Sequence, residues 1–109
     1  MTGSDWIQTY TGKKFFPLDP DPEMICIEDI AHSLSYLCRY NGHSKIFYSV
    51  AQHSLVLSRE LCSGWQYALM ALLHDASEAY LSDLPRPLKM HPKFAFYREA
   101  EARLQSMIY

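Results

Sequence analysis

The chain has few cysteines, and their arrangement argues against two kinds of protein. Its 109 residues contain three of them, Cys26, Cys38 and Cys62, which are widely spaced and include no Cys-x-x-Cys pair. An odd number of scattered cysteines does not build a disulfide framework, and thiolate zinc sites ordinarily need close pairs. The composition therefore predicts a protein of a reducing compartment, with the cytoplasm as the expected location.

Long apolar runs and a strong charge imbalance are also missing. No run approaches the ~20 apolar residues that a membrane-spanning helix needs, and residues 1–14 lack the apolar stretch of a signal peptide. The formal net charge is only −2, which argues against non-specific binding to a nucleic-acid duplex. We therefore expect neither a membrane nor a nucleic-acid polymer as a partner.

The chain does have enough apolar surface for one core. It contains eight Tyr, five Phe and two Trp, and apolar residues make up 49% of it. Disorder is not expected at this composition. Because a chain of this length ordinarily folds around one core, we expect a single domain over residues 1–109.

The first part of the chain predicts a hairpin and then a helix. Two aromatic, β-prone runs flank Thr11 and Gly12 within residues 6–17, which favours a short β-hairpin. A proline-rich loop follows. Apolar residues at helical spacing then predict a first helix over residues 27–41, which an Asn-Gly pair would stop.

Three further helices are predicted beyond it. Ser49 opens a capping box for a second helix that runs to about residue 61. The same pattern at Ser63 predicts a third helix over residues 64–82, and a fourth helix follows Pro92. The sequence therefore predicts a mainly α fold with a short N-terminal β-hairpin.

The third predicted helix is unusual because it is apolar on nearly all sides, as helices at the centre of a domain are. Yet His74, Asp75 and Glu78 lie within about 100° of one another around its axis, away from the main apolar stripe. Burying two carboxylates without partners costs on the order of several kcal/mol each. A cation is therefore expected to face them, and a metal ion with an adjacent Arg or Lys would serve.

His53, on the apolar face of the second predicted helix, is a further candidate ligand. If the second and third helices pack antiparallel, it approaches His74 and Asp75, and metal sites in helical domains draw ligands from facing helices. Two imidazoles and a carboxylate suit Zn, Mn, Fe, Co or Ni better than Ca. The competing interpretation is a hydrogen-bonded core histidine at His53 and a solvated helix carboxylate at Glu78.

Two segments resemble the HD-domain metal-dependent phosphohydrolases: VAQHS at residues 50–54 and HDASEAYLSDLPRPLK at residues 74–89. The family signature is a His on one helix, a His-Asp pair on a later helix, and a final Asp on a helix after that. The likeness covers roughly residues 25–90 and is closest to small 5′-deoxynucleotidases and phage-type dATP phosphohydrolases. It implies an HD-domain helical bundle, a divalent metal cofactor (Zn, Mn, Co, Fe, Ni or Mg) and a small nucleotide substrate.

The resemblance also implies roles in metal binding and catalysis. His53, His74 and Asp75 would bind the metal ion, and Glu78 would orient or deprotonate the attacking water. Asp83 would hold the substrate or a water near the phosphate. For Asp83, capping the turn before Leu84 is nearly as good an interpretation.

Three more residues match positions that contact the substrate in the family. Arg39 and Lys89 would bind phosphate, and Tyr40 would press on the sugar and exclude a 2′-hydroxyl. Arg39 could equally be a helix C-terminal cation that the helix dipole favours.

The chain departs from the family at the fourth ligand. No Asp follows Asp83, and the last predicted helix offers only Glu99 and Glu101. We therefore expect the C-terminal helices of the family to be absent, which would expose apolar surface and favour homo-oligomers. The predicted function is metal-dependent release of phosphate from a (deoxy)nucleotide. The alternative is a catalytically inactive HD module that binds a nucleotide or a protein partner.

Overall fold

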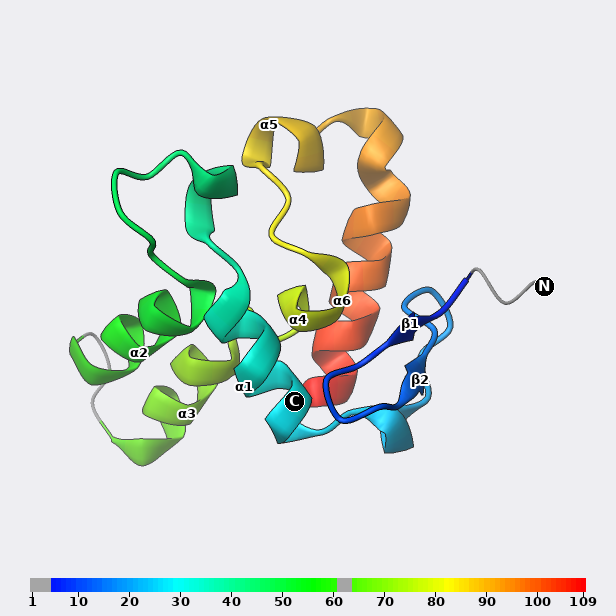
Figure 1. Ribbon diagram of the computed structural model, residues 1–109, viewed down its shortest axis with the longest axis horizontal. Coiled ribbons are helices and arrows are strands. Elements are labelled where there is room, and N and C mark those ends of the chain that lie inside the picture. The colour runs from blue at the N-terminus through cyan, green and yellow to red at the C-terminus, as the bar shows by residue number, and fades with distance from the viewer. Residues whose placement is uncertain (1–4, 61–63) are drawn as a thin grey trace.

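The structure, a computed structural model, describes residues 5–60 and 64–109. It is mainly helical, with a two-stranded antiparallel sheet near the N-terminus (Figure 1). This confirms the predicted fold class of a mainly α protein with a short hairpin. Within the described ranges, no helix combines the length and the apolar character that crossing a membrane requires.

The hairpin is fastened to the helices by its turn and by one strand. β1 (Ile7–Gln8) pairs antiparallel with β2 (Lys14–Phe15). At the turn, the buried carboxylate of Asp29 accepts hydrogen bonds from the Thr11 backbone N–H at 2.8 Å and from the Thr11 hydroxyl at 3.0 Å. Phe15 is buried in the core. The hairpin therefore closes over one side of the helical part.

The first helix, α1 (Ile27–Tyr36), is shorter than the sequence predicts. The chain becomes extended at Leu37, and Cys38 forms an antiparallel bridge with Ser49. The backbone hydrogen bonds beside this bridge, each of 2.8 Å, join the end of α1 to the segment before the next helix. The predicted helix over residues 27–41 is therefore wrong beyond Tyr36, and the Asn-Gly pair belongs instead to the short 3-10 segment η2 (Arg39–Gly42).

The second helix, α2 (Val50–Glu60), begins with the predicted capping box. The Gln52 backbone N–H donates to the Ser49 hydroxyl at 3.0 Å, and the Gln52 side-chain oxygen accepts from the Ser49 N–H at 2.8 Å. α2 packs against α1 and α3. The predicted end of this helix at Leu61 and the capping pattern at Ser63 lie outside the described residues.

The prediction of one helix over residues 64–82 is wrong, because the chain forms two helices there. α3 (Trp65–Leu73) ends just before the His-Asp pair, and α4 (Glu78–Leu81) begins after it. The four residues between them form tight turns. Between the two helices, the side-chain amide of Gln105 bonds to the Leu73 carbonyl and to the Ser77 N–H, two groups that would bond to each other in a continuous helix.

The expectation of a central, buried third helix is also wrong. α3 has no buried residue, and its Trp65 is 75% exposed. The expectation that apolar surface lies open to solvent does hold for this helix. The core lies among β2, α1, α4, the start of α2 and the last helix, and consists of Phe15, Ile30, Leu34, Val50, Ala76, Tyr80 and Leu104.

The remaining elements are short except for the last helix. η1 (Pro22–Met24) precedes α1, and α5 (Arg86–Lys89) is a single turn that the sequence did not predict. η3 (Pro92–Phe94) leads into α6 (Ala95–Ile108), which confirms the predicted helix after Pro92. Figure 1 shows α6 passing from the level of α5 down beside α4. It therefore borders the whole segment that carries the His-Asp pair.

Replacing Ser49 with Ala should lower the free energy of unfolding by about 1 kcal/mol, because the first turn of α2 loses its side-chain acceptor. Urea unfolding followed by far-ultraviolet circular dichroism measures the change. Ser35→Ala is the control, since Ser35 is exposed and bonds only to the Ala31 carbonyl of its own helix. Its effect should stay within about 0.5 kcal/mol. Equal losses in the two variants would contradict the capping role.

Candidate metal centre

The structure brings together the three residues that the sequence singled out as metal ligands. His53, His74 and Asp75 each offer one ligand atom, and these atoms all lie within 4.8 Å of one another. His53 comes from α2, and the other two come from the turn after α3. The rings of the two histidines meet edge to face, with centroids 5.5 Å apart. Within residues 5–60 and 64–109, this is the one such group of His, Cys, Asp or Glu.

His74 is held in one orientation by its two ring nitrogens. Nδ1 lies 2.6 Å from the Ala71 carbonyl, and Nε2 lies 2.8 Å from Oδ2 of Asp75. The hydrogen bond to Asp75 raises the pKa of His74. Burial alone would raise the pKa of Asp75, but the hydrogen bond and charge of His74 outweigh it and lower that pKa. Because a carbonyl can only accept, it keeps a proton on Nδ1. Nε2 donates to Asp75 in the metal-free protein, and it is the nitrogen that would bind a metal ion after losing its proton.

His53 is held by a cation. Nη1 of Arg39 lies 2.9 Å from Nδ1 of His53, and a guanidinium can only donate. Burial and the positive charge of Arg39 lower the pKa of His53, so the imidazole stays neutral. His53 is thus a hydrogen-bonded, half-buried histidine as well as a candidate ligand. An ion that binds at Nδ1 would have to take the place of the guanidinium there.

Glu78 lies beside this group in an unusual electrostatic position. Only 7% of the residue is exposed, and within the described part of the chain its Oε1 has no hydrogen-bond partner. Burial, followed by the negative charges of Asp75 and Asp83, raises the pKa of Glu78 to about 9. Burial and the charge of Asp75 also raise the pKa of Asp83. The protein therefore concentrates more negative charge here than it can keep ionised without an added cation.

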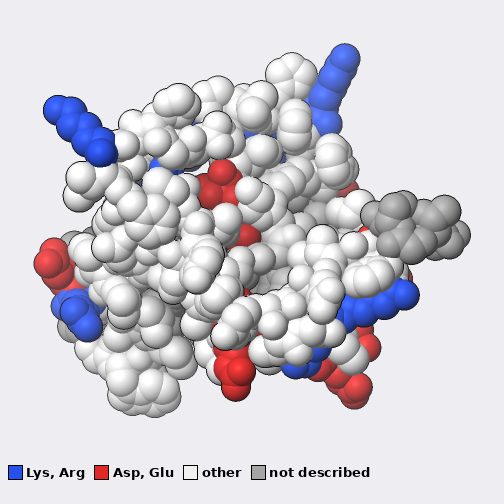
Figure 2. Space-filling model, in the orientation of Figure 1, with Lys and Arg blue, Asp and Glu red and all other residues white. Residues whose placement is uncertain are grey.

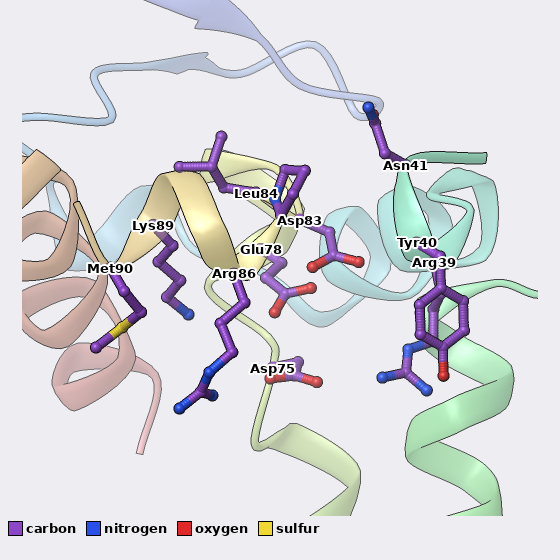
Figure 3. Close-up of a pocket in the computed structure, with 11 residues that line it drawn as sticks. Arg39, Tyr40, Asn41, Asp75, Glu78, Asp83, Leu84, Arg86, Lys89 and Met90 are labelled. Carbon is purple, nitrogen blue, oxygen red and sulfur yellow. The ribbon is translucent and has the colours of Figure 1, made fainter. Parts of the chain in front are cut away.

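The acidic groups open into a cavity of about 470 Å³. Figure 2 shows acidic side chains at the bottom of a hollow near the centre of one face. In Figure 3 the three carboxyl groups lie in the middle of the cavity, with Arg39 on one side and two further cations on the other. The charged lining residues are Asp75, Glu78, Asp83, Arg39, Arg86 and Lys89.

The predicted substrate-contacting residues line the same cavity, but they differ in their exposure and in the contacts they already make. Tyr40 is 61% exposed, has a left-handed backbone (φ 59°), and stacks over Arg39 with the guanidinium carbon 4.7 Å from its ring centre. Lys89 lines the cavity but also forms an ion pair of 2.8 Å with Glu101 of α6. Tyr40 is therefore placed at the rim, and Lys89 is shared between the cavity and α6.

Two residues near the centre are not among the predicted site residues. Arg86 begins α5 and lines the cavity, and its place directly after Pro85 in the loop beyond the His-Asp pair was the available signal. Gln105 contacts the backbone on both sides of the His-Asp turn. No local signal could have found it, because it lies 28 residues beyond Ser77.

The donor set fits a divalent transition metal ion. Two imidazoles and one carboxylate are ligands that Zn, Mn, Fe, Co and Ni accept. The unpartnered Oε1 of Glu78 points to the same conclusion, because a buried carboxyl oxygen without a partner is costly. A cation bound at His53, His74 and Asp75 would relieve the repulsion by Asp75, which after burial is the next cause of the raised pKa of Glu78.

Comparison with known proteins finds two relatives whose printed names give no activity. The uncharacterized protein YfdR of Escherichia coli (strain K12) is 41% identical over 103 residues, which cover 94% of this chain and 56% of YfdR. The uncharacterized protein RCAP_rcc00048 of Rhodobacter capsulatus is 41% identical over 91 residues, which cover 77% of this chain and 46% of that protein. The chain thus spans about half the length of the curated relatives it matches. No family model matches it.

Glu78→Gln should stabilise the metal-free protein increasingly as the pH rises. The folded-state pKa of Glu78, about 9, lies above its ordinary value of 4.5, so between these values the carboxyl is protonated in the folded protein and ionised in the unfolded chain, which lowers wild-type stability as the pH rises. The gain should be absent below about pH 4.5 and grow toward pH 9, by at most on the order of 1.4 kcal/mol per pH unit.

Urea unfolding in EDTA at several pH values measures this difference. Glu99→Gln is the matched control, because Glu99 is exposed on α6, and its stability profile should follow that of the wild type. A Glu78→Gln profile that runs parallel to the wild type across the whole pH range would contradict the buried, protonated carboxyl.

Proposed function

We propose that this chain is a metal-dependent phosphohydrolase of the HD-domain type that releases phosphate from a small nucleotide, in particular a deoxynucleotide. One observation carries the proposal. The ligand atoms of His53, His74 and Asp75 lie within 4.8 Å of one another, and Asp75 also lines a cavity that contains a buried acid and several cations. The resemblance of residues 74–89 to the family supports the reaction class.

In this proposal His53, His74 and Asp75 hold the metal ion. When bound, such an ion lowers the pKa of a water molecule and stabilises negative charge on phosphoryl oxygens. The Ala71 carbonyl holds a proton on Nδ1 of His74, so the metal ion would bind at Nε2 in place of the proton that Nε2 shares with Asp75. Asp75 contributes the anionic ligand, whose depressed pKa keeps it ionised near neutral pH.

Glu78 is the proposed general base. Its carboxyl is buried beside Asp75, and its pKa is about 9 as long as the neighbouring negative charges are not neutralised. A cation that offsets Asp75 would lower the pKa of Glu78, and a base is most effective when its pKa lies near the working pH. Glu78 would then orient the attacking water and accept its proton, with Asp83 holding a second water or the substrate.

The cationic side chains of the cavity would bind the phosphate of the substrate. Arg39 lies on one side of the carboxyl groups, and Arg86 and Lys89 lie on the other (Figure 3). Guanidinium and ammonium groups stabilise the charge that develops on phosphoryl oxygens. Arg39 would leave Nδ1 of His53 to contact the phosphate, and Tyr40, beside it at the rim, would press on the sugar and disfavour a 2′-hydroxyl.

A catalytically inactive module that binds a nucleotide is the second candidate. The hydrogen bond between Arg39 and His53 favours it, because the guanidinium already occupies Nδ1 of one proposed ligand. In such a protein the cationic side chains of the cavity would still bind a phosphate group. The two candidates differ in turnover rather than in what they bind.

Purified protein should release inorganic phosphate from at least one deoxynucleotide in a panel of mono- and triphosphates assayed with Mn, Co, Zn or Mg. His74→Ala and Asp75→Asn should each reduce kcat/KM at least about 100-fold, because each removes a metal ligand. Glu99→Gln, an exposed change on α6, should leave the rate unchanged. Calorimetry with the same nucleotides reports binding separately from turnover.

Absence of phosphate release with every metal, together with measurable nucleotide binding, would replace the enzyme by the inactive module. Release that survives unchanged in Asp75→Asn would contradict the assignment of this residue as a metal ligand.

A further inference from the structure

The turn that carries the His-Asp pair is bridged by a side chain from α6. The amide Nε2 of Gln105 donates to the Leu73 carbonyl at 2.7 Å, and its Oε1 accepts from the Ser77 backbone N–H at 3.0 Å. In an uninterrupted α-helix the N–H of Ser77 would bond directly to the carbonyl of Leu73, four residues earlier. The amide of Gln105 is thus inserted into one hydrogen bond of what would otherwise be a continuous helix.

This insertion changes the backbone around the two candidate ligands. On either side of them the hydrogen bonds span three residues instead of four, from Ala76 to Leu73 at 3.0 Å and from Glu78 to Asp75 at 2.9 Å. His74 and Asp75 therefore lie in a tight turn, where side chains no longer follow the spacing of an α-helix. Their ligand atoms meet His53 from this turn.

We propose that Gln105 is a positioning residue for the candidate metal centre. By holding the helix open between Leu73 and Ser77, it sets the direction in which His74 and Asp75 present their ligand atoms to His53. The role of Gln105 in metal binding rests on the metal-dependent function proposed above. Its effect on the backbone is independent of that function, so the metal role and the backbone effect can be tested separately.

The surroundings of Gln105 suit this role. Leu104, its neighbour on α6, is fully buried in the core and anchors α6 next to the His-Asp turn. Ser77 is also buried, so its backbone N–H depends on a protein partner. The Leu73 carbonyl also accepts from the Ala76 N–H, so without the amide it is the Ser77 N–H that loses its partner, and closing the helix onto Leu73 would restore one. Closure would replace the three-residue hydrogen bonds around His74 and Asp75 with four-residue ones and so rotate their side chains about the helix axis.

Gln105→Met tests the proposal, because Met has a similar length and makes neither hydrogen bond. Two measurements are made on wild type and variant: backbone NMR chemical shifts of the metal-free protein over residues 73–78, and calorimetric titration with Mn²⁺ alone. Relative to wild type, we expect the shifts of this segment in the variant to move toward those of a continuous α-helix, and Mn²⁺ affinity to be at least about 10-fold weaker. Gln105→Glu keeps the acceptor for Ser77 but loses the donor for Leu73. Its backbone shifts and Mn²⁺ affinity should lie between those of wild type and Gln105→Met, and it serves as the second variant if Gln105→Met does not fold.

Leu104→Val is the matched control for general destabilisation. It loosens the core next to Gln105 but keeps the amide, so it should lower the thermal midpoint while Mn²⁺ affinity stays within about twofold of wild type. A purely structural role for Gln105 would make the affinities of the two variants fall in parallel with stability, and that result would overturn the proposal. So would a turn that persists in Gln105→Met with unchanged affinity. If the wild type binds no Mn²⁺ while the helix closes in Gln105→Met, the metal-dependent function fails and control of the turn by Gln105 is supported.

Discussion

The repulsion among three carboxyl groups in one half-buried cavity is the constraint on which the rest of this structure depends. Asp75, Glu78 and Asp83 all line that cavity, and the raised pKa values of the latter two express the cost of burial first and then of ionising them beside one another. In the metal-free chain this repulsion is reduced because Asp75 pairs with His74 and because Glu78 stays protonated near neutral pH. A divalent cation between the histidines and Asp75 would reduce the repulsion further.

These groups stay together because α6 holds the backbone that carries them. Gln105 contacts both sides of the His-Asp turn, and the hydroxyl of Tyr97 donates to the Leu81 and Ser82 carbonyls just before Asp83. Further along, Glu101 pairs with Lys89 at the cavity wall. One helix therefore fixes the turn, the acidic loop and a cation of the site, which explains how a segment with so little regular structure keeps its charged groups in place.

Local signals in the sequence predicted what local interactions determine. The capping box at Ser49 and the helix after Pro92 are present because the residues that specify them are neighbours in the chain. The cluster of His53 with the His-Asp pair followed from helix packing and from the family resemblance. Long-range contacts decided the rest: a β-bridge ends α1 early, and an amide 28 residues beyond Ser77 divides the helix predicted over residues 64–82. The exposure of α3 likewise depends on which elements cover it, and its apolar composition does not reveal that.

The central claim is that the two histidines and Asp75 form one cation site that balances this charge. Its most direct test is a crystal structure of the protein with Zn²⁺, with anomalous differences recorded at the zinc edge. The account predicts one strong peak about 2.1 Å from an imidazole nitrogen of His53, from Nε2 of His74 and from a carboxylate oxygen of Asp75. A map without a peak among these three residues, with Arg39 still bonded to His53, would contradict it.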